Sequence, residues 1–164
     1  MAKKKYIPDK LDLKIISELE RDGRVSFRTI AEKLAISDQT ARFRVTRLIE
    51  NEIMRISPLI NPFHFDNTLL SLIGIQLESR TQKETMERIS KMENVVSVCN
   101  TAGEFDLFIE AFHQSRSELN RFLFEELPKV PGIKNTHSFV FLDAKNKWIE
   151  TGNCSIPSRM NSSG

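Results

Sequence analysis

Three arginines lie within the six positions from Arg42 to Arg47, in the stretch RVSFRTIAEKLAISDQTARFRVTRLIENEI. A guanidinium group binds phosphate oxygens, and it can also donate two hydrogen bonds to one guanine edge. A run of charges is more often a solvated helix face. That alternative is weakened because no acidic residue lies between Arg42 and Arg47 to neutralise the arginines one turn away. The spacing therefore favours binding to a polyanion.

The elements that must position these arginines form a predicted helix-turn-helix. Asp9 is a good N-cap for a first helix, whose apolar residues recur at helical spacing and which ends at Asp22-Gly23. Ser26 caps a second, short helix. Ala35-Ile36 forms a break, and Ser37 caps a third helix, which carries the arginines. In this motif the later helix enters the major groove of DNA.

The third helix has two predicted faces. A step of about 100° per residue places three apolar residues on a buried stripe: Ala41, Val45 and Leu48. The predicted DNA-binding residues are its cap, its opposite face and its flanks: Ser37, Gln39, Thr40, Arg42, Phe43, Arg44, Thr46 and Arg47. Early residues of a recognition helix reach base edges, and later ones meet phosphates. Gln39 and Arg42 are thus candidate base readers, whereas Arg44, Thr46 and Arg47 are assigned to the backbone. Phe43 fits either a thymine methyl contact or packing.

The charge is divided unevenly along the chain of 164 residues, which has a formal net charge of +2. Residues 1–57 hold 13 Lys and Arg against 9 Asp and Glu, a net +4, and residues 58–164 hold 11 against 13, a net −2. A basic module beside a slightly acidic one is the pattern expected when only the first meets a polyanion.

Other functional classes find little support in the composition. No apolar run approaches the roughly 20 residues of a membrane span or follows the N-terminal lysines as in a signal peptide, so a cytoplasmic protein is expected. Cys99 and Cys154 form neither a disulfide framework nor a metal-ligand spacing and are interpreted as incidental. His64, His113 and His137 have no partner at nucleophile or metal spacing. No catalytic residue, metal or cofactor is predicted.

The second part of the chain alternates strand and helix patterns. Pro58 and Pro62 favour an extended connector, although a strand packed on the first domain fits as well. Capping boxes at Thr81 with Glu84 and at Ser115 with Glu118 start two helices between predicted strands. The order β-α-β-β-α-β is typical of a ferredoxin-like sandwich, with AGEF as a hairpin between its middle strands. The predicted parts are a helix-turn-helix domain at 1–56, a linker or hinge strand at 57–68, a ferredoxin-like domain at 69–150 and a flexible tail at 151–164.

Several short motifs occur together in a specific order. Asp9 and Asp12 open the first helix, DGRVSF, IAEKLAIS and RFRVTRLIENEI follow, and AGEFD and VPGI come later. Over residues 9 to 145 the chain resembles the Lrp/AsnC (leucine-responsive, feast/famine) regulators. The resemblance implies an α+β protein with an N-terminal winged helix-turn-helix and a C-terminal βαββαβ domain. It also implies a sequence-specific, double-stranded-DNA-binding transcription regulator that is a homodimer through its sheets, assembles to octamers and binds an amino acid effector between dimers.

Two positions depart from the family pattern. The family usually has a glycine just after the recognition helix, where this chain has Asn51-Glu52, so Asn51 is expected to adopt the left-handed conformation there. Asp38 follows Ser37 where the family often has proline, and both residue types suit the first turn of a helix. Neither departure alters the expected fold.

The resemblance also implies an effector site at the loop Gly103-Glu104-Phe105-Asp106. Asp106 would pair with the ammonium of an amino acid, and backbone N–H groups near Gly103 would bind its carboxylate. A plain hairpin explains the same residues, and both interpretations remain open. Thr136 and Ser138 in the last strand are weaker candidates for this pocket.

Two other functions are alternatives. Some proteins with this two-domain plan are sirohaem decarboxylases, which carry a histidine- and tyrosine-bearing motif in the hairpin region, and VCNTAGEFDLF contains neither residue. An architectural DNA-binding protein without an effector is the other alternative, and it would bind with steep salt dependence but no preferred site.

Overall fold

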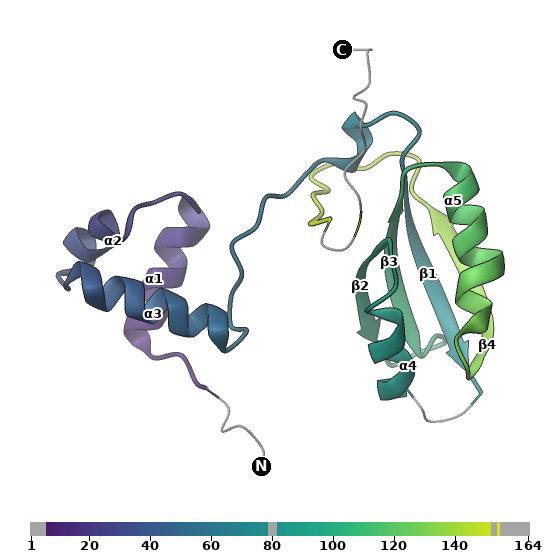
Figure 1. Ribbon diagram of the computed structural model, residues 1–164, viewed down its shortest axis with the longest axis horizontal. Helices are drawn as coiled ribbons and strands as arrows, with labels where there is room; N and C mark the ends of the chain where they lie inside the picture. The colour runs from purple at the N-terminus through teal and green to yellow at the C-terminus, as the bar shows by residue number, and fades with distance from the viewer. Residues whose placement is uncertain (1–5, 79–81, 152–153, 155–164) are drawn as a thin grey trace. The chain divides into compact units, whose positions relative to one another are not determined.

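The computed structural model of the chain describes residues 6–78, 82–151 and 154 (Figure 1). The contacts between residues divide the chain into two compact units, and the boundary along the chain falls between Ser57 and Pro58. Among the described residues, no helix is long and apolar enough to cross a membrane.

The first unit consists of three helices, α1 (Lys10–Arg21), α2 (Phe27–Leu34) and α3 (Asp38–Glu50). The predicted caps are confirmed, since Asp9, Ser26 and Ser37 each accept a hydrogen bond from a backbone N–H of the first turn that follows. Between α2 and α3, Ala35 adopts the left-handed conformation (φ 53°, ψ 46°) and forms the predicted break. The helix-turn-helix is therefore present.

The end of α3 differs from the expectation in one residue. Glu52, not Asn51, is left-handed, with φ of 56° against −95°. The Asn51 side chain instead donates from Nδ2 to the Arg47 carbonyl at 2.8 Å, which satisfies one of the last helical acceptors. The following turn closes with the Ile53 N–H on the Leu48 carbonyl at 2.9 Å. Asparagine thus caps the helix through its side chain, and the next residue makes the turn.

The core of this unit includes the predicted stripe of α3. Fully or nearly fully buried side chains come from all three helices: Ile15, Ile30, Ala31, Ala41, Val45 and Leu48. Residues 6–57 contain helices and turns but no strand, so the winged form that the resemblance implied is wrong for the described part of this unit. The only short helix in the connector is a 3-10 turn at Pro62–His64 within the described residues.

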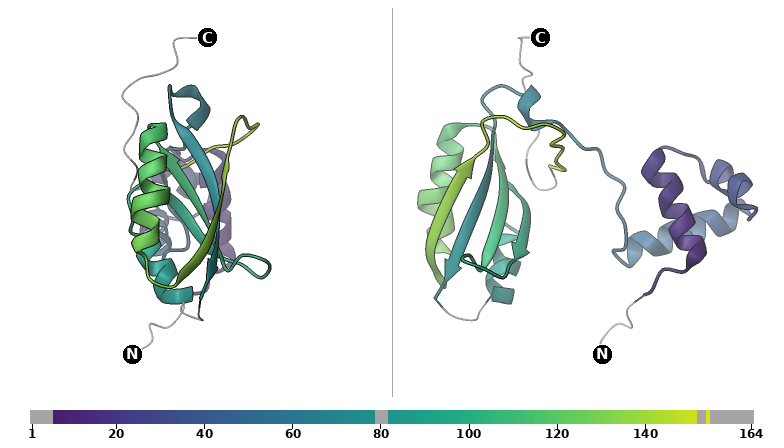
Figure 2. Two further views of the ribbon diagram at one scale, coloured as in Figure 1. Left: turned by 90° about the vertical axis from the view of Figure 1, so that its right-hand side faces the viewer. Right: turned by 180° about the vertical axis from the view of Figure 1, so that it is seen from behind.

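The second unit is the predicted βαββαβ fold. Its elements are β1 (Leu69–Leu77), α4 (Gln82–Ile89), β2 (Val95–Asn100), β3 (Leu107–His113), α5 (Arg116–Arg121) and β4 (Ile133–Val140). A short π-helical turn at Phe122–Glu126 and a 3-10 helical turn at Leu127–Lys129 continue α5. The antiparallel sheet has the order β2-β3-β1-β4, and both helices cover one face of it (Figures 1 and 2). The capping box expected at Thr81 lies outside the described residues, whereas Ser115 accepts the Glu118 N–H as predicted.

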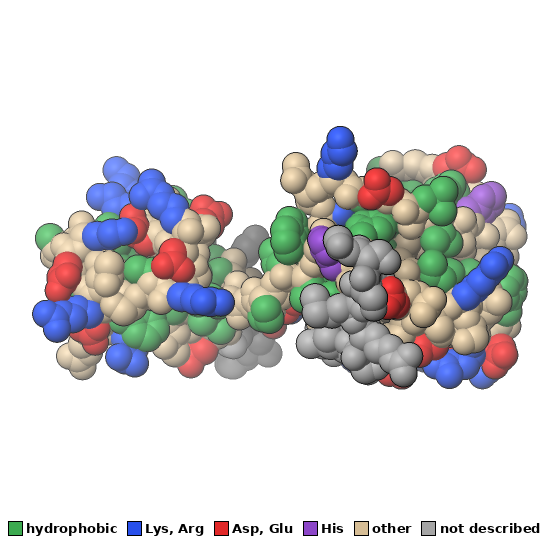
Figure 3. Space-filling view, turned by 90° about the horizontal axis from the view of Figure 1, so that it is seen from above, with side chains coloured by type: hydrophobic (Ala, Val, Ile, Leu, Met, Phe, Trp, Pro, Cys, Tyr) green, Lys and Arg blue, Asp and Glu red, His purple; other side chains and the backbone are tan. Residues whose placement is uncertain are grey.

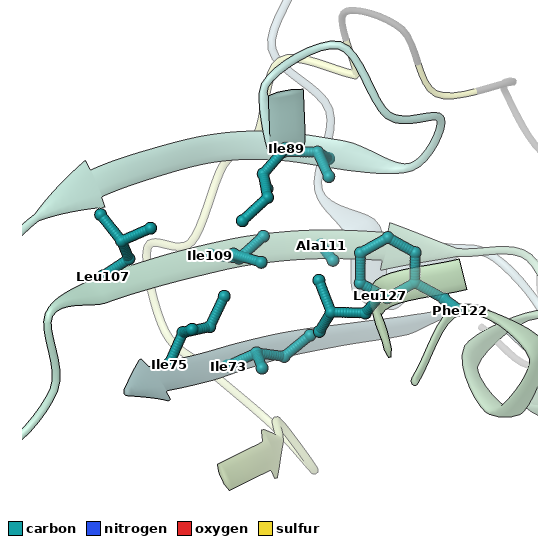
Figure 4. Packing of buried hydrophobic residues seen from close by; sticks show 9 residues of the cluster. Ile73, Ile75, Ile89, Leu107, Ile109, Ala111, Phe122 and Leu127 are labelled. Carbon is teal, nitrogen blue, oxygen red and sulfur yellow. The ribbon is translucent and has the colours of Figure 1, made fainter. Parts of the chain in front are cut away.

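The helix-covered face of the sheet holds the main core of this unit (Figure 4). Strands β1, β2 and β3, helix α4 and the two turns that continue α5 supply its buried side chains: Ile73, Ile75, Ile89, Val95, Leu107, Ile109, Ala111, Phe122 and Leu127. Alternation along a strand sends the intervening residues to the opposite face, which we call the open face.

One end of the open face is covered by the connector and the C-terminal segment. Leu70 and Phe112 pack there with Ile149 and Cys154. Ile60 and Ile149 exchange backbone hydrogen bonds of 2.9 and 3.0 Å and form an isolated antiparallel bridge. Cys154 is therefore not an incidental residue of a loose tail, and burial raises the pKa of its thiol to about 11.

Candidate nucleic-acid interface and effector loop

Helix α3 exposes most of the residues assigned to DNA. Its N-cap and outward positions are exposed, namely Ser37, Gln39, Arg42, Phe43 and Thr46, while Thr40 is half-buried. The hydroxyls of Ser37 and Thr40 lie 2.8 Å apart and pair with each other. Figure 3 shows Lys and Arg side chains of this unit interspersed with Asp and Glu. The positive charge that α3 can offer to DNA therefore depends on how each arginine is paired with nearby carboxylates.

Arg42 is the most accessible of the three arginines, with a side chain 62% exposed. Its Nη2 lies 3.7 Å from Asp38 Oδ2, one helical turn earlier, and its Cζ lies 4.7 Å from the centre of the Phe27 ring. The expectation that this face lacks an acidic partner is therefore wrong for Arg42. An exposed pair of this length holds the side chain only weakly. Arg42 remains able to donate its hydrogen bonds elsewhere.

Arg44 lies against α1 and is not open to a ligand in the way the sequence suggested. Its Nη1 donates to Asp9 Oδ2 at 2.6 Å and to Asp12 Oδ1 at 2.9 Å, and its side chain is 21% exposed. The hydrogen bond with Asp9 raises the pKa of Arg44 and lowers that of Asp9. Arg44, which the sequence assigned to the DNA backbone, is therefore held in an internal ion pair. The partners precede Arg44 by 35 and 32 residues, beyond any helical spacing.

Asp12 is the centre of this network and is fully buried. Burial raises the pKa of Asp12, but hydrogen bonds from the Tyr6 hydroxyl, the Asp9 N–H and Arg44 outweigh it, so the pKa lies below its ordinary value. Asp12 also closes the capping box of α1 by accepting the Asp9 N–H at 2.9 Å. Sequence reasoning treated Asp12 only as part of a family motif, and its charge inside an apolar stripe was the signal of a buried partner.

Arg47 lies between two aromatic rings. Its Cζ is 4.5 Å from the centre of the Tyr6 ring and 5.5 Å from that of Phe43. Nη2 donates to the Tyr6 hydroxyl and lies 3.8 Å from Asp12 Oδ2, and 34% of the side chain is exposed. Tyr6 was not among the predicted site residues, because its contact with Arg47 spans 41 positions of the sequence.

In the second unit, the loop predicted to bind an effector is fixed to the open face. A Cβ on Gly74 would lie 2.7 Å from the Phe105 ring, so this ring packs directly on the glycine backbone. Phe105 also contacts Phe108 and His137, with ring centres 5.3 and 5.2 Å apart. The Glu104 carbonyl accepts a hydrogen bond from Gln76 Nε2 at 3.2 Å.

The Asp106 carboxylate is engaged within the fold. Oδ2 accepts the Leu77 N–H at 2.7 Å and Oδ1 accepts from Gln82 Nε2 at 3.2 Å. Its own N–H donates to the Ile75 carbonyl at 2.8 Å. These bonds support the hairpin interpretation for Asp106. Gly103 is exposed and a Cβ there would meet no atom within 4 Å, but its φ of 157° is a backbone conformation that favours glycine.

Thr136 and Ser138 lie on the other face of the sheet. Strand register pairs Thr136 with Ile75 and Ser138 with Ile73, two residues of the helix-covered face. Both are exposed because β4 is an edge strand. The structure therefore does not bring them together with the loop from Gly103 to Phe105, which packs over the open face.

The histidines do not form a site among the described residues, where no group of three or more His, Cys, Asp or Glu could hold a metal ion. His113 is fully buried, 5.1 Å from the Phe122 ring, and neither ring nitrogen has a hydrogen-bond partner there. Burial lowers its pKa to about 4, against the opposing charges of Glu118 and Glu126. His113 is thus a neutral packing residue.

Comparison with known protein families assigns a family domain to each of the two units. The model of the AsnC-type helix-turn-helix domain matches residues 9–49, and that of the Lrp/AsnC ligand binding domain matches residues 70–147. The chain belongs to the Lrp/AsnC family. A relative described as an uncharacterized HTH-type transcriptional regulator of Pyrococcus furiosus is 33% identical over 85% of this chain and 95% of its own. The regulator Ptr1 of Methanocaldococcus jannaschii is 33% identical over 78% and 89%.

Solved structures share the fold of this family member. The E. coli AsnC structure has a TM-score of 0.65 and 22% identity, covering 85% of this chain and 95% of AsnC. An L-Met complex of the transcriptional regulator NMB0573 from Neisseria meningitidis has a TM-score of 0.64 and 22% identity, covering 84% and 91%.

Proposed function

We propose that this Lrp/AsnC family member is a sequence-specific transcription regulator that binds double-stranded DNA through α3 and acts as a homo-oligomer in the cytoplasm. The observation that carries the proposal is the exposed face of α3, where Gln39 and Arg42 project beside a fully buried stripe. Named relatives of this chain are HTH-type transcriptional regulators.

The proposed interface divides by contact type. Gln39 and Arg42, in the first turns of α3, read base edges in the major groove. Thr46 and Arg47 bind phosphates, and Phe43, whose side chain is 62% exposed, lies against a thymine methyl group. Ser37 and Thr40 contribute through the capped helix start, which orients backbone N–H groups toward a phosphate. Arg44 is a structural residue that fixes α3 on α1.

Assembly follows from the open face of the second unit. Beyond the part covered by the connector, this face carries the aromatic rings of Phe105 and Phe108, and Phe139 of β4, whose register places it on the same face, is 54% exposed. Contiguous exposed apolar surface marks an interaction site. We propose a homodimer through this face, which assembles further to an octamer. Two recognition helices in a dimer read a palindromic site.

An amino acid is the proposed effector, because the related NMB0573 structure is a complex with L-Met. The exposed Gly103 and Glu104 are its proposed contacts, and Phe105 and Asp106 hold the loop in place. Thr136 and Ser138 could reach such a ligand only from another chain of the oligomer, because in their own chain they lie on the other face of the sheet.

Selection of bound sequences from a random DNA pool, at about 150 mM salt, tests the proposed function. A shared palindromic motif is the expected result. Tight binding without a shared motif would identify an architectural protein, and no binding at all would overturn the DNA-binding proposal and reopen the enzyme alternative. The oligomer is tested separately by light scattering, where a monomer at micromolar concentration would contradict it.

A further inference from the structure

The segment before α1 contributes one side chain to the candidate DNA interface. Tyr6 reaches α3, where its ring lies under the Arg47 guanidinium and its hydroxyl accepts a hydrogen bond from Arg47 Nη2. The same hydroxyl donates to Asp12 Oδ2. Tyr6 is thus inserted between a surface arginine and a fully buried carboxylate.

We propose that Tyr6 is a positioning residue for DNA binding, which holds Arg47 at the surface and keeps it from donating a hydrogen bond directly to Asp12. This inference rests on the proposed function, since it assigns Arg47 to a DNA phosphate. It extends the interface to a residue outside the helix-turn-helix.

The two neighbouring arginines of the network show what Tyr6 prevents. Arg44 donates directly to Asp12 at 2.9 Å and is 21% exposed. Arg47 is 3.8 Å from the other oxygen of Asp12, beyond hydrogen-bond distance, and is 34% exposed. Only the Tyr6 hydroxyl bonds to both Arg47 and Asp12 among the described contacts. Without this hydroxyl, Arg47 would close its 3.8 Å ion pair with Asp12 to a direct hydrogen bond like that of Arg44, and less of its charge would be available to a phosphate.

Stacking leaves Arg47 free to donate. A guanidinium has five N–H donors, and contact with an aromatic face uses none of them. Arg47 commits Nη2 to the Tyr6 hydroxyl. The rings of Tyr6 and Phe43 restrict the rotamers of the long side chain before DNA arrives, so less conformational freedom is lost when a phosphate binds.

The test measures DNA affinity of the full chain against salt concentration, using the selected site and an unrelated duplex. We expect Tyr6→Ala to weaken binding to both duplexes alike, about 3- to 10-fold, and to reduce the salt slope by about one phosphate contact, as Arg47→Ala does. The double variant should bind no more weakly than Arg47→Ala alone. Ile7→Ala is the matched control, because this neighbour is 80% exposed. It should leave affinity and slope unchanged.

Melting temperatures separate positioning from folding. A purely structural Tyr6 would lower the melting temperature while the folded protein kept its salt slope, and that result would overturn the inference. Additive losses in the double variant would overturn it too. If Tyr6→Ala fails to fold, Tyr6→Phe provides the test of the proposal, because it keeps the ring but removes the hydroxyl. It should still reduce the slope, and an unchanged slope would contradict the proposal. A native protein that binds no DNA would overturn the proposed function itself.

Discussion

The two candidate sites differ in how much of each is supplied by one chain. The proposed DNA-binding face of the first unit lies on a single helix, and its supporting residues Asp9, Asp12 and Tyr6 come from the same compact unit. The effector candidates of the second unit lie on opposite faces of one sheet. A site on one element is complete in a monomer, whereas residues on two faces can meet only through another copy.

This difference predicts that the first unit depends on an internal ion-pair network. Asp12→Ala removes the buried carboxylate that holds Arg44 and the start of α1. We expect a loss of about 2–3 kcal/mol of unfolding free energy, less than for a fully buried pair because Arg44 remains partly exposed. Denaturant unfolding followed in the isolated unit 1–57 and in the full chain measures it, with Lys14→Ala on exposed α1 surface as control. A loss equal to that of the control would show that Asp12 stabilises little.

The folding stability of the two units should also depend differently on pH, because the second unit contains the buried His113. Its folded pKa is about 4 against an ordinary 6.5, so the unfolded chain takes up the proton first. Stability should therefore fall as the pH drops from about 6.5 to about 4, by roughly 2–3 kcal/mol. Carboxylates with lowered pKa values, Asp9 and Asp12, keep their contribution above pH 4 and lose it only as the pH falls further.

Calorimetry between pH 4 and 7 checks this contrast. His113→Leu should remove the dependence over that range from the second unit, and the exposed His64→Gln should not. The interpretation fails if the first unit loses stability in the same range, or if His113→Leu retains the full slope.

A substitution on the open face should cause a smaller loss of stability. Gly74→Ala places a Cβ 2.7 Å from the Phe105 ring, so the ring and its loop must shift. We expect a loss of about 1–3 kcal/mol in the second unit and a shift of the oligomer toward smaller species in light scattering. Gly23→Ala is the control in the first unit, where the nearest atoms lie at 3.9 Å. Adding Phe105→Leu to Gly74→Ala should restore part of the loss, and no restoration would mean that the ring contact is not its source.

On α3, the three arginines should separate by function. Arg42→Ala should relax preference at one base pair by about 1–2 kcal/mol. Arg47→Ala should weaken all sequences alike, and Arg44→Ala should lower stability while the folded fraction keeps its preference. Binding to a panel of single-base variants at fixed salt measures all three. If Arg44→Ala alone changes the preferred base, the internal ion pair is not its main role.

The sequence predicted the features that depend on neighbouring residues, and it missed the contacts between residues that are far apart in the chain. The caps at Ser26 and Ser37 follow from side chains that bond within three residues, and the stripe from Ala41 to Leu48 follows from helical period. The ion pairs of Arg44 were missed because its partners lie 35 and 32 residues earlier in the chain. Thr136 was grouped with the hairpin loop because strand order says which strands pair, but only the register says which face each residue occupies.

The smallest expected effect concerns the effector, and it tests whether the second site needs another chain. An amino acid present at about five times its Kd should stabilise the protein by about 1 kcal/mol, seen as a small rise in melting temperature. A screen of the twenty amino acids against the native protein finds it. If the ligand lies between copies, the gain should disappear in a variant made monomeric at the open face, while Gly103→Val should abolish it without changing DNA affinity. Ser138→Ala should weaken the gain only when the site draws on the last strand of a neighbouring chain. A ligand that stabilises the monomer equally would show that one chain holds the whole site, and the contrast between the two units would then be lost.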